Sequence, residues 1–208
     1  MKILFSILLL AASPSFAADR AGFDLGSMSA QSIAADKSNA NTLSVPVAVP
    51  VPAKQPKSAV FNGIEIKGSE AFSTKTKEAL TLLKGSANFK KVSPYIAVIT
   101  EGDHSGMAAY AAKPTFEVSS KTWTQPTEWY AGTIAHDGYH SLLYHQAKAS
   151  TGRTPADDVW TGASAEKTCL AFQEAVLTEL KADYYAKYVH GLISDPEYQN
   201  IPYSQRNW

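Results

Sequence analysis

Two histidines four residues apart, with an acidic residue directly after the first, form the part of this chain best suited to chemistry. They lie in residues 133–146, which read TIAHDGYHSLLYHQ. On a helix, side chains at i and i+4 lie one above the other, so His136 and His140 can direct their imidazoles at one metal ion, with Asp137 at the edge of that face. The spacing predicts a metal-binding helix. The chain has five histidines, so the alternative is a chance pair that is hydrogen-bonded in the core.

A third ligand must come from elsewhere in the chain, because a catalytic zinc ion typically has three protein ligands and one water molecule. Two glutamates of the next predicted helix compete for this role. Glu166 is in register with Cys169 and Gln173 on the apolar face, and we favour it because that register turns its carboxylate toward the core. Alternatively, Glu166 is an acidic residue in the first turn of the helix, favoured by the helix dipole, with Ser164 as the N-cap. The alternative for Glu179 is a place on a solvated helix face.

The sequence HDGYH resembles the active-site motif H-E-x-x-H of the zincin metallopeptidases, with Asp137 in the place of the glutamate. The metzincin pattern would require Gly at position 143 and His at position 146, and Leu143 and Gln146 exclude it. The gluzincin pattern takes a glutamate from a later helix. A small residue follows Glu166 after three positions and a glutamine follows it after seven. This pattern is similar to the ligand helix of several secreted gluzincin-like families. Glu179 opens an E-x-x-A-D stretch that resembles other gluzincins.

The resemblance implies an exported zinc-dependent, peptidase-like hydrolase that cleaves peptide bonds with metal-activated water. His136, His140 and Glu166 would hold Zn²⁺, which suits this ligand set better than iron or copper by analogy and ligand type. Asp137 would be the catalytic general base, taking a proton from the water and passing it to the leaving amine. The partner would be a peptide or protein substrate.

Asp137 also supports a second hypothesis. Aspartate is one methylene shorter than glutamate, which moves the carboxylate by about 1.5 Å, one C–C bond. A misplacement of about 1 Å can lower a rate about 100-fold. Either the helix lies closer to the metal, or the protein is a catalytically weak or inactive zincin-fold binding module of the cell envelope.

Further roles follow from the resemblance. A tyrosine or arginine could stabilise the oxyanion, and the candidates, between which the sequence does not choose, are Tyr184, Tyr185, Tyr203 and Arg206. Zincins also place an edge strand beside the cleft, which pairs with an extended peptide by backbone hydrogen bonds. Residues 113–120, KPTFEVSS, are expected to be this strand.

The other histidines and the cysteine are expected to lie away from the site. His145 is about 140° around the helix from His140. His104 lies in a loop, and His190 suits a helix C-terminus. Cys169 is the only cysteine, and its place on an apolar helix face predicts a buried core residue. A thiol enzyme is a third hypothesis, and it requires Cys169 to be exposed.

The first half of the folded region is expected to contribute strands and one helix. Asn62-Gly63 predicts a hairpin turn. A helix is expected in STKTKEALTLLKGS, with Ser73 or Thr74 near the N-cap and Gly85 just past the end. Residues 94–100 have the composition of a strand, and two further strand-like pieces follow on either side of Lys113-Pro114.

The second half is expected to be helical. The motif helix starts around Pro126-Thr127, and Gly138 in its middle costs about 1 kcal/mol relative to alanine, which suggests close approach of another backbone segment. Residues 148–164 are expected to form a polar loop, and residues 165–190 a second long helix. This order predicts an α+β fold that is zincin-like: a small mixed sheet with an active-site helix and a following ligand helix.

The N-terminal part predicts export. Residues 1–17 read as a signal peptide, residues 18–58 as a flexible Pro/Ala/Val-rich spacer, and residues 59–208 as the metal-binding domain. The protein is therefore expected to be secreted or periplasmic, with no membrane span in the mature chain. Lys+Arg equals Asp+Glu, so the formal net charge is +0 and nothing points to nucleic acid as a partner.

Overall fold

The structure is a computed structural model that describes residues 57–202. The expected signal peptide and nearly all of the expected spacer lie outside the described residues. The sheet begins at Lys57, so residues 57 and 58 belong to the domain. None of the helices within residues 57–202 has the length and apolar character that a membrane crossing requires.

The domain is α+β, with a mixed five-stranded sheet in the order β1-β2-β3-β5-β4, as expected for the fold class. The pairs β2–β3 and β3–β5 are parallel, and the two outer pairs are antiparallel. The strands are β1 (Lys57–Phe61), β2 (Ile64–Gly68), β3 (Val98–Glu101), β4 (Gly106–Ala108) and β5 (Thr115–Val118).

Burial alternates along β2 and β5, so one face of the sheet is covered there. Ile66 and Phe116 are completely buried, whereas Lys67 and Glu117 are exposed. This period of two is typical of a sheet with one face against the core.

The β1–β2 hairpin confirms the prediction at Asn62-Gly63. Both residues have positive φ, 50° and 82°, as a two-residue type I′ turn requires. The turn fixes the register in which Phe61 opposes Ile64.

The edge-strand prediction for residues 113–120 is wrong. Strand β5 lies inside the sheet, between β3 and β4, and the edge is formed by β4. Strand β4 overlaps the first of the two strand-like pieces expected around Lys113-Pro114, but the sequence does not show that this three-residue strand pairs outside β5.

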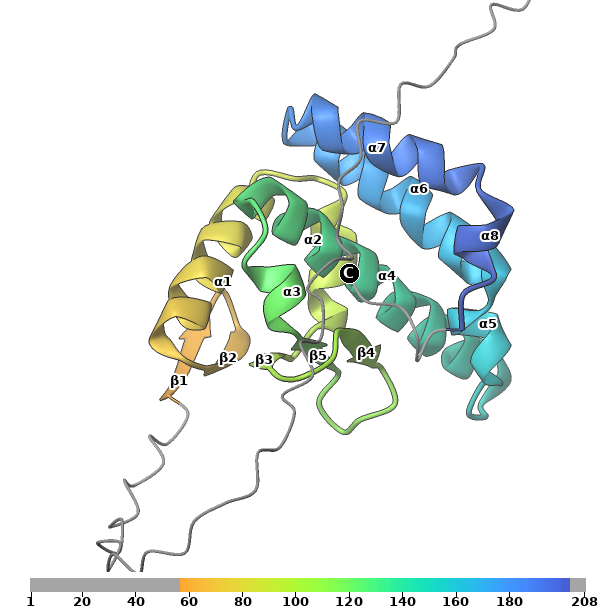
Figure 1. Ribbon diagram of the computed structural model, residues 1–208. Helices are drawn as coiled ribbons and strands as arrows, with labels where there is room; N and C mark the ends of the chain where they lie inside the picture. The colour runs from red at the N-terminus through yellow and green to blue at the C-terminus, as the bar shows by residue number, and fades with distance from the viewer. Residues whose placement is uncertain (1–56, 203–208) are drawn as a thin grey trace, which may run out of the picture. The chain divides into compact units, whose positions relative to one another are not determined.

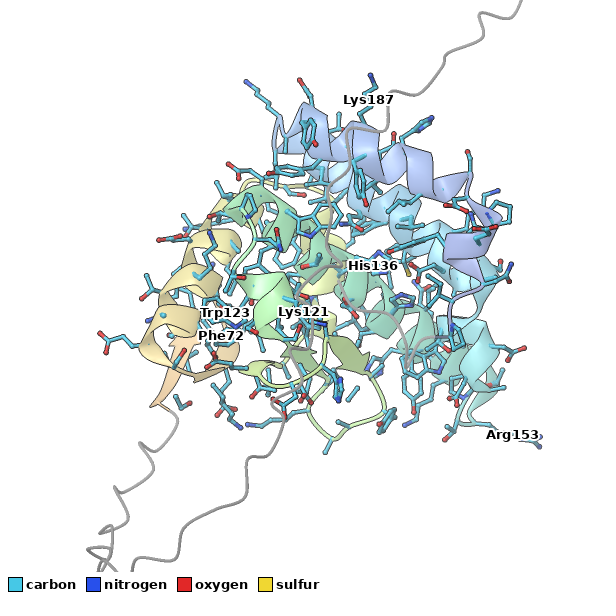
Figure 2. All side chains as sticks on the ribbon, viewed as in Figure 1. Phe72, Lys121, Trp123, His136, Arg153 and Lys187 are labelled. Atoms are coloured by element: carbon cyan, nitrogen blue, oxygen red, sulfur yellow. The ribbon has the colours of Figure 1, made fainter. Side chains whose placement is uncertain are left out.

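Helix α1 (Glu70–Leu83) starts earlier than predicted. Its N-cap is Ser69, whose side chain accepts a hydrogen bond from the backbone N–H of Phe72, so neither Ser73 nor Thr74 is the cap. Gly85 lies two residues past the end, as expected. Phe72 also meets Trp123 of helix α3 (Ser120–Trp123) edge to face, with ring centroids 5.8 Å apart (Figure 2).

The predicted strand over residues 94–100 is only partly present. Helix α2 (Phe89–Val92) and the 3₁₀ helix η1 (Ser93–Tyr95) come first, and β3 begins at Val98. Pro94 lies in the first turn of η1, where its missing N–H costs nothing.

Helix α4 (Thr127–Thr151) carries the histidine motif and starts where it was predicted. It is buried on nearly all sides from Tyr130 to Tyr144, as is typical of a helix inside a core. It lies between the sheet and the pair α6–α7 (Figure 1), and it contacts β4, β5 and α6.

Only residues 152–156 and 162 of the predicted polar loop at residues 148–164 lie outside helices. Helix α4 continues through Thr151 and ends at Gly152, which has φ 67°. Helix α5 (Asp157–Thr161) then forms, with two aspartates in its first turn, and it buries Trp160 to 3% exposure.

The predicted helix over residues 165–190 is two helices, α6 (Ala163–Glu179) and α7 (Asp183–Ile193). Lys181 separates them with φ 59°. Its N–H donates to the Thr178 carbonyl and the Ala182 N–H donates to the Leu177 carbonyl, which is a Schellman ending. Glycine usually marks this position, so the lysine gave no signal. Helix α8 (Pro196–Gln199) follows.

Candidate metal centre

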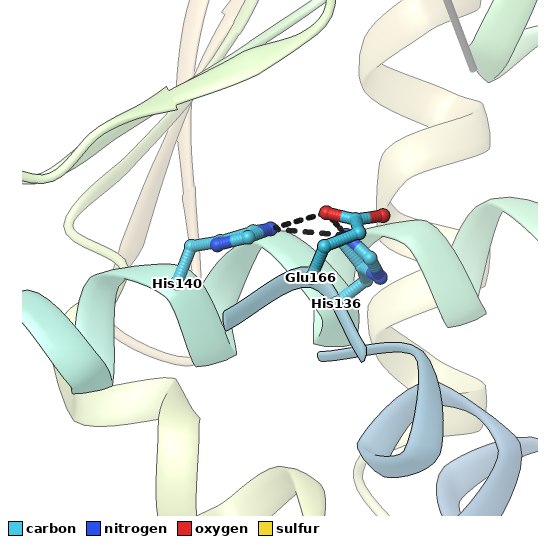
Figure 3. Close-up of side chains that lie close together, drawn as sticks. All are labelled: His136, His140 and Glu166. Carbon is cyan, nitrogen blue, oxygen red and sulfur yellow. Dashed lines mark hydrogen bonds and ion pairs between the residues drawn. The ribbon is translucent and has the colours of Figure 1, made fainter. Parts of the chain in front are cut away.

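His136 and His140 of α4 and Glu166 of α6 converge on one point inside the domain (Figure 3). The two Nε2 atoms are 3.1 Å apart. Oε2 of Glu166 lies 3.5 Å from Nε2 of His136 and 3.3 Å from Nε2 of His140. The three residues are 2%, 0% and 0% exposed.

These separations suit a tetrahedral ion. With bonds of about 2.0–2.1 Å to nitrogen and carboxylate oxygen, two corners of a tetrahedron are about 3.3–3.4 Å apart. The separations of 3.1, 3.3 and 3.5 Å lie on both sides of that value. The group can therefore hold a metal ion without rearranging its side chains.

Helix packing brings the three ligands together. The histidines occupy successive turns of α4, and Glu166 lies in the first turn of α6. Gly132 lets the two helices approach closely, because a Cβ there would lie 3.0 Å from the Leu177 side chain and 3.2 Å from Nε2 of Gln173.

Gly138 provides close packing on another side of α4. A Cβ there would lie 2.7 Å from Cδ1 of Ile96 and 3.2 Å from Cγ2 of Val92. The expected close approach is therefore made by side chains and not by another backbone segment.

Trp160 orients one of the imidazoles. Nδ1 of His140 lies 2.5 Å from the backbone carbonyl of Trp160. A carbonyl only accepts hydrogen bonds, so Nδ1 carries a proton, and Nε2 is the nitrogen that faces the other two residues and can bind a metal ion. Sequence reasoning missed Trp160, and the only signal was a tryptophan in an otherwise polar segment.

Glu166 is held in its ionised form. Burial raises its pKa, but the charge of His136 and hydrogen bonds from both imidazoles outweigh burial and hold the pKa well below its usual range. A carboxylate binds a metal only when it is ionised. A buried anion also requires compensation, which a cation at this point would supply.

Asp137 is completely buried, but its carboxylate is not part of the group whose donor atoms lie within 4.8 Å of one another. Glu179, the rival ligand, lies at the other end of α6. There it accepts hydrogen bonds from Ser86 and from the backbone and side chain of Asn88.

The remaining histidines and the cysteine do not join the group, within the part of the chain that the structure describes. His145 contacts the ring of Tyr95, His104 is exposed, and His190 pairs with a glutamate on the surface. Cys169 is completely buried, as expected, which removes the basis for a thiol enzyme.

A small cavity adjoins His136. It has about 10 Å³ of space and is lined by Trp129, Thr133, His136, Gln173 and Tyr198. That is about the space one water molecule requires, and the hydroxyl and amide groups in its wall suit a water. Of the three ligand residues only His136 lines the cavity, so the cavity lies beside the group and is not shown to reach the point that the three donor atoms share.

Of the expected oxyanion candidates, Tyr184 and Tyr185 are not in the wall of this cavity. Tyr184 is 72% exposed, and Tyr185 packs against Trp129. Tyr203 and Arg206 lie outside the described residues. Tyr198 lines the cavity, and sequence reasoning missed it because the irregular tail gave no orientation.

Figure 2 shows His136 in the middle of the domain, whereas Arg153 and Lys187 lie at its rim.

No protein-family model, curated protein or solved structure matches the chain. The function must therefore be inferred from the geometry of the site.

Proposed function

We propose that the protein is an exported zinc-dependent, peptidase-like hydrolase with a zincin-like fold. The observation that carries this proposal is the buried group of His136, His140 and Glu166, with separations that suit a tetrahedral ion. A cavity with space for about one water molecule adjoins His136, and a catalytic zinc site needs a water molecule close by in addition to three protein ligands.

The order of elements also supports the proposal. An antiparallel edge strand, β4, is followed by the inner strand β5, the histidine helix α4 and the glutamate helix α6. Strand β4 contacts α4. A peptide that paired with the outer edge of β4 would extend the sheet beside the helix that carries the motif.

The chain's own residues would divide the work as follows. His136, His140 and Glu166 would hold Zn²⁺, with His140 oriented by the Trp160 carbonyl. Zinc, when bound, supplies Lewis-acid polarisation of a carbonyl and lowers the pKa of water toward about 7. Asp137 would take the proton from the attacking water and deliver it to the leaving amine.

The enclosure of the site sets a condition on catalysis. A cavity of about 10 Å³ has no room for a peptide. Tyr198, which lines it, would have to move away from Trp129 before a scissile bond could approach His136. Tyr198 belongs to α8, a four-residue helix, so its displacement would disturb little regular structure.

The same enclosure favours a second candidate function, a binding module whose metal is structural. Structural zinc sites are closed, and here all three ligands are at most 2% exposed. Asp137, outside the group of three, fits this candidate as well.

One pair of variants separates the two candidates. The purified protein is loaded with zinc and incubated with a mixture of peptides, and products are identified by mass spectrometry. For a hydrolase, Asp137→Asn retains zinc and loses cleavage. For a structural site, no peptide is cut by the wild type, and Asp137→Glu gains nothing.

A further inference from the structure

A group of four aromatic side chains, two of them exposed and two partly buried, lies next to the metal centre. We call Trp129, Tyr184, Tyr185 and Tyr188 the aromatic platform. The ring centroids of Trp129 are 5.9 Å from Tyr185 and 5.6 Å from Tyr188, and Tyr184 lies 5.2 Å from Tyr185. Residues from two helices, α4 and α7, thus form one continuous aromatic surface.

The platform is more exposed than a purely structural role requires. Tyr184 is 72% exposed and Tyr188 is 53% exposed. Trp129 and Tyr185 are partly buried and pack against the core between α6 and α7, whereas Tyr184 and Tyr188 leave more than half of their surface in solvent. Large exposed aromatic side chains that are grouped together are typical of binding sites.

Trp129 connects the platform to the site. It contacts Tyr185 and Tyr188, and it also lines the cavity beside His136. A part of a peptide held at the metal centre would therefore have the platform beside it, on the side of Trp129.

The surface of the platform is uncharged. Burial, together with the neighbouring Glu128 and Tyr184, raises the pKa of Tyr185, so its hydroxyl stays neutral. A neutral aromatic surface suits an uncharged side chain with a large apolar area, and the neighbouring Glu128 disfavours an acidic one.

We infer that the aromatic platform is a substrate subsite that receives an aromatic or large aliphatic side chain of a peptide, next to the bond positioned at His136, His140 and Glu166. This inference rests on the proposed function and adds the class of substrate. Ring stacking and the burial of apolar area would select Phe, Tyr or Leu over Ala or Glu at that position.

The test compares peptides that differ at one position, Phe or Ala, on zinc-loaded protein that carries Asp137→Asn to prevent turnover. Zinc content is measured first, and peptide affinity follows from fluorescence anisotropy. We expect the Phe peptide to bind about tenfold more tightly, the range that one well-packed aromatic contact provides.

Tyr184→Ala combined with Tyr188→Ala should reduce that preference to less than about threefold and leave zinc content unchanged. Both side chains are mainly exposed, so the fold should tolerate their loss. Val60→Ala is the matched control, since Val60 is 71% exposed on β1 and lies outside the platform. It should leave the preference intact.

Three results would overturn the inference: equal affinity for the two peptides, no binding of either peptide, or a preference that survives the double substitution. Dimerisation that the double substitution abolishes would assign the platform to a second copy of the chain and would also overturn it. Failure to bind zinc would instead contradict the proposed function itself.

Discussion

The two ends of α6 carry the same side chain in opposite roles. At the N-terminal end, Glu166 is completely buried and directs one carboxylate oxygen at two imidazoles. At the C-terminal end, Glu179 is exposed and holds Ser86 and Asn88 by hydrogen bonds. The partners of Glu166 are imidazole nitrogens, which can also bind a metal ion. The partners of Glu179 are hydroxyl and amide groups, which hold a turn in place.

The difference shows that the partners of a carboxylate, and not its presence on a ligand helix, decide whether it can bind a metal. The hydroxyl and amide N–H groups around Glu179 are permanent donors, so they satisfy it without a cation. Imidazole nitrogens are donors or acceptors depending on protonation, so the partners of Glu166 can themselves become metal ligands.

Glu166→Gln should have the largest effect, which is on zinc affinity. If a third of a binding free energy of about 12 kcal/mol is lost with one ligand of three, zinc affinity should fall about 1,000-fold. Competition with a chelator of known affinity measures the change. Glu179→Gln is the matched control and should bind zinc as the wild type does. Equal affinities in the two variants would remove the distinction between the two ends of α6.

Asp137→Asn tests the residue that lies beside the histidines but outside their group. Peptide hydrolysis by the zinc-loaded variant should fall at least about 100-fold, the usual contribution of a general base, with zinc affinity unchanged. Asp137→Glu should keep or raise the rate, because it restores the side chain of the H-E-x-x-H motif. If the protein cleaves peptides and neither substitution changes the rate, another residue must be the general base.

Acid should reduce the contribution of Glu166 to the stability of the metal-free protein. The folded-state pKa of Glu166 lies below its ordinary value of 4.5, so its contribution to stability is present above pH 4.5 and is lost as the pH falls toward the folded-state pKa. Below pH 4.5, the free energy of unfolding should fall more steeply in the wild type than in Glu166→Gln, by up to about 1.4 kcal/mol per pH unit. Urea unfolding at several pH values between 3 and 6 measures the slopes, and parallel slopes would contradict this account of Glu166.

Glu179→Gln should have a structural effect only. The substitution weakens charge-assisted hydrogen bonds to Ser86 and Asn88, and the free energy of unfolding should fall by about 1 kcal/mol. Thermal unfolding of the metal-free protein measures it. If the free energy of zinc binding fell by more than the free energy of unfolding, this end of the helix would also contribute to the metal site.

Lys181→Gly should have the smallest effect, at the Schellman ending just beyond Glu179. Glycine adopts positive φ without the steric cost of a lysine, and the entropy it loses on folding offsets part of that gain. The free energy of unfolding should rise by about 0.5 kcal/mol. A destabilised variant, detected by the same thermal unfolding, would show that the lysine side chain makes a contact the fold requires.

The sequence predicted the parts of the site and fold that follow from local periodicity. The i, i+4 spacing placed His136 and His140 on one face, and helical register chose Glu166 over Glu179 as the glutamate that faces them. Asn62-Gly63 gave the hairpin turn. Each of these depends on a repeat or a turn type that a few neighbouring residues determine.

The parts that were missed depend on residues distant in sequence. Trp160 reaches His140 through its backbone carbonyl, which no side-chain pattern reveals. Tyr198 lines the cavity because α8 folds back over α6, and the place of β5 inside the sheet depends on the three-residue strand β4. The helix break at Lys181 was hidden because a lysine occupies a position that usually holds glycine.

The most direct test of the central claim is the metal content of the purified protein, combined with X-ray absorption at the zinc edge. The account predicts one zinc ion per chain, bound by two imidazole nitrogens and at least one oxygen at about 2.0–2.1 Å, and none in a His136→Ala/His140→Ala variant. A wild-type protein that binds no zinc, or a double variant that binds as much, would contradict it.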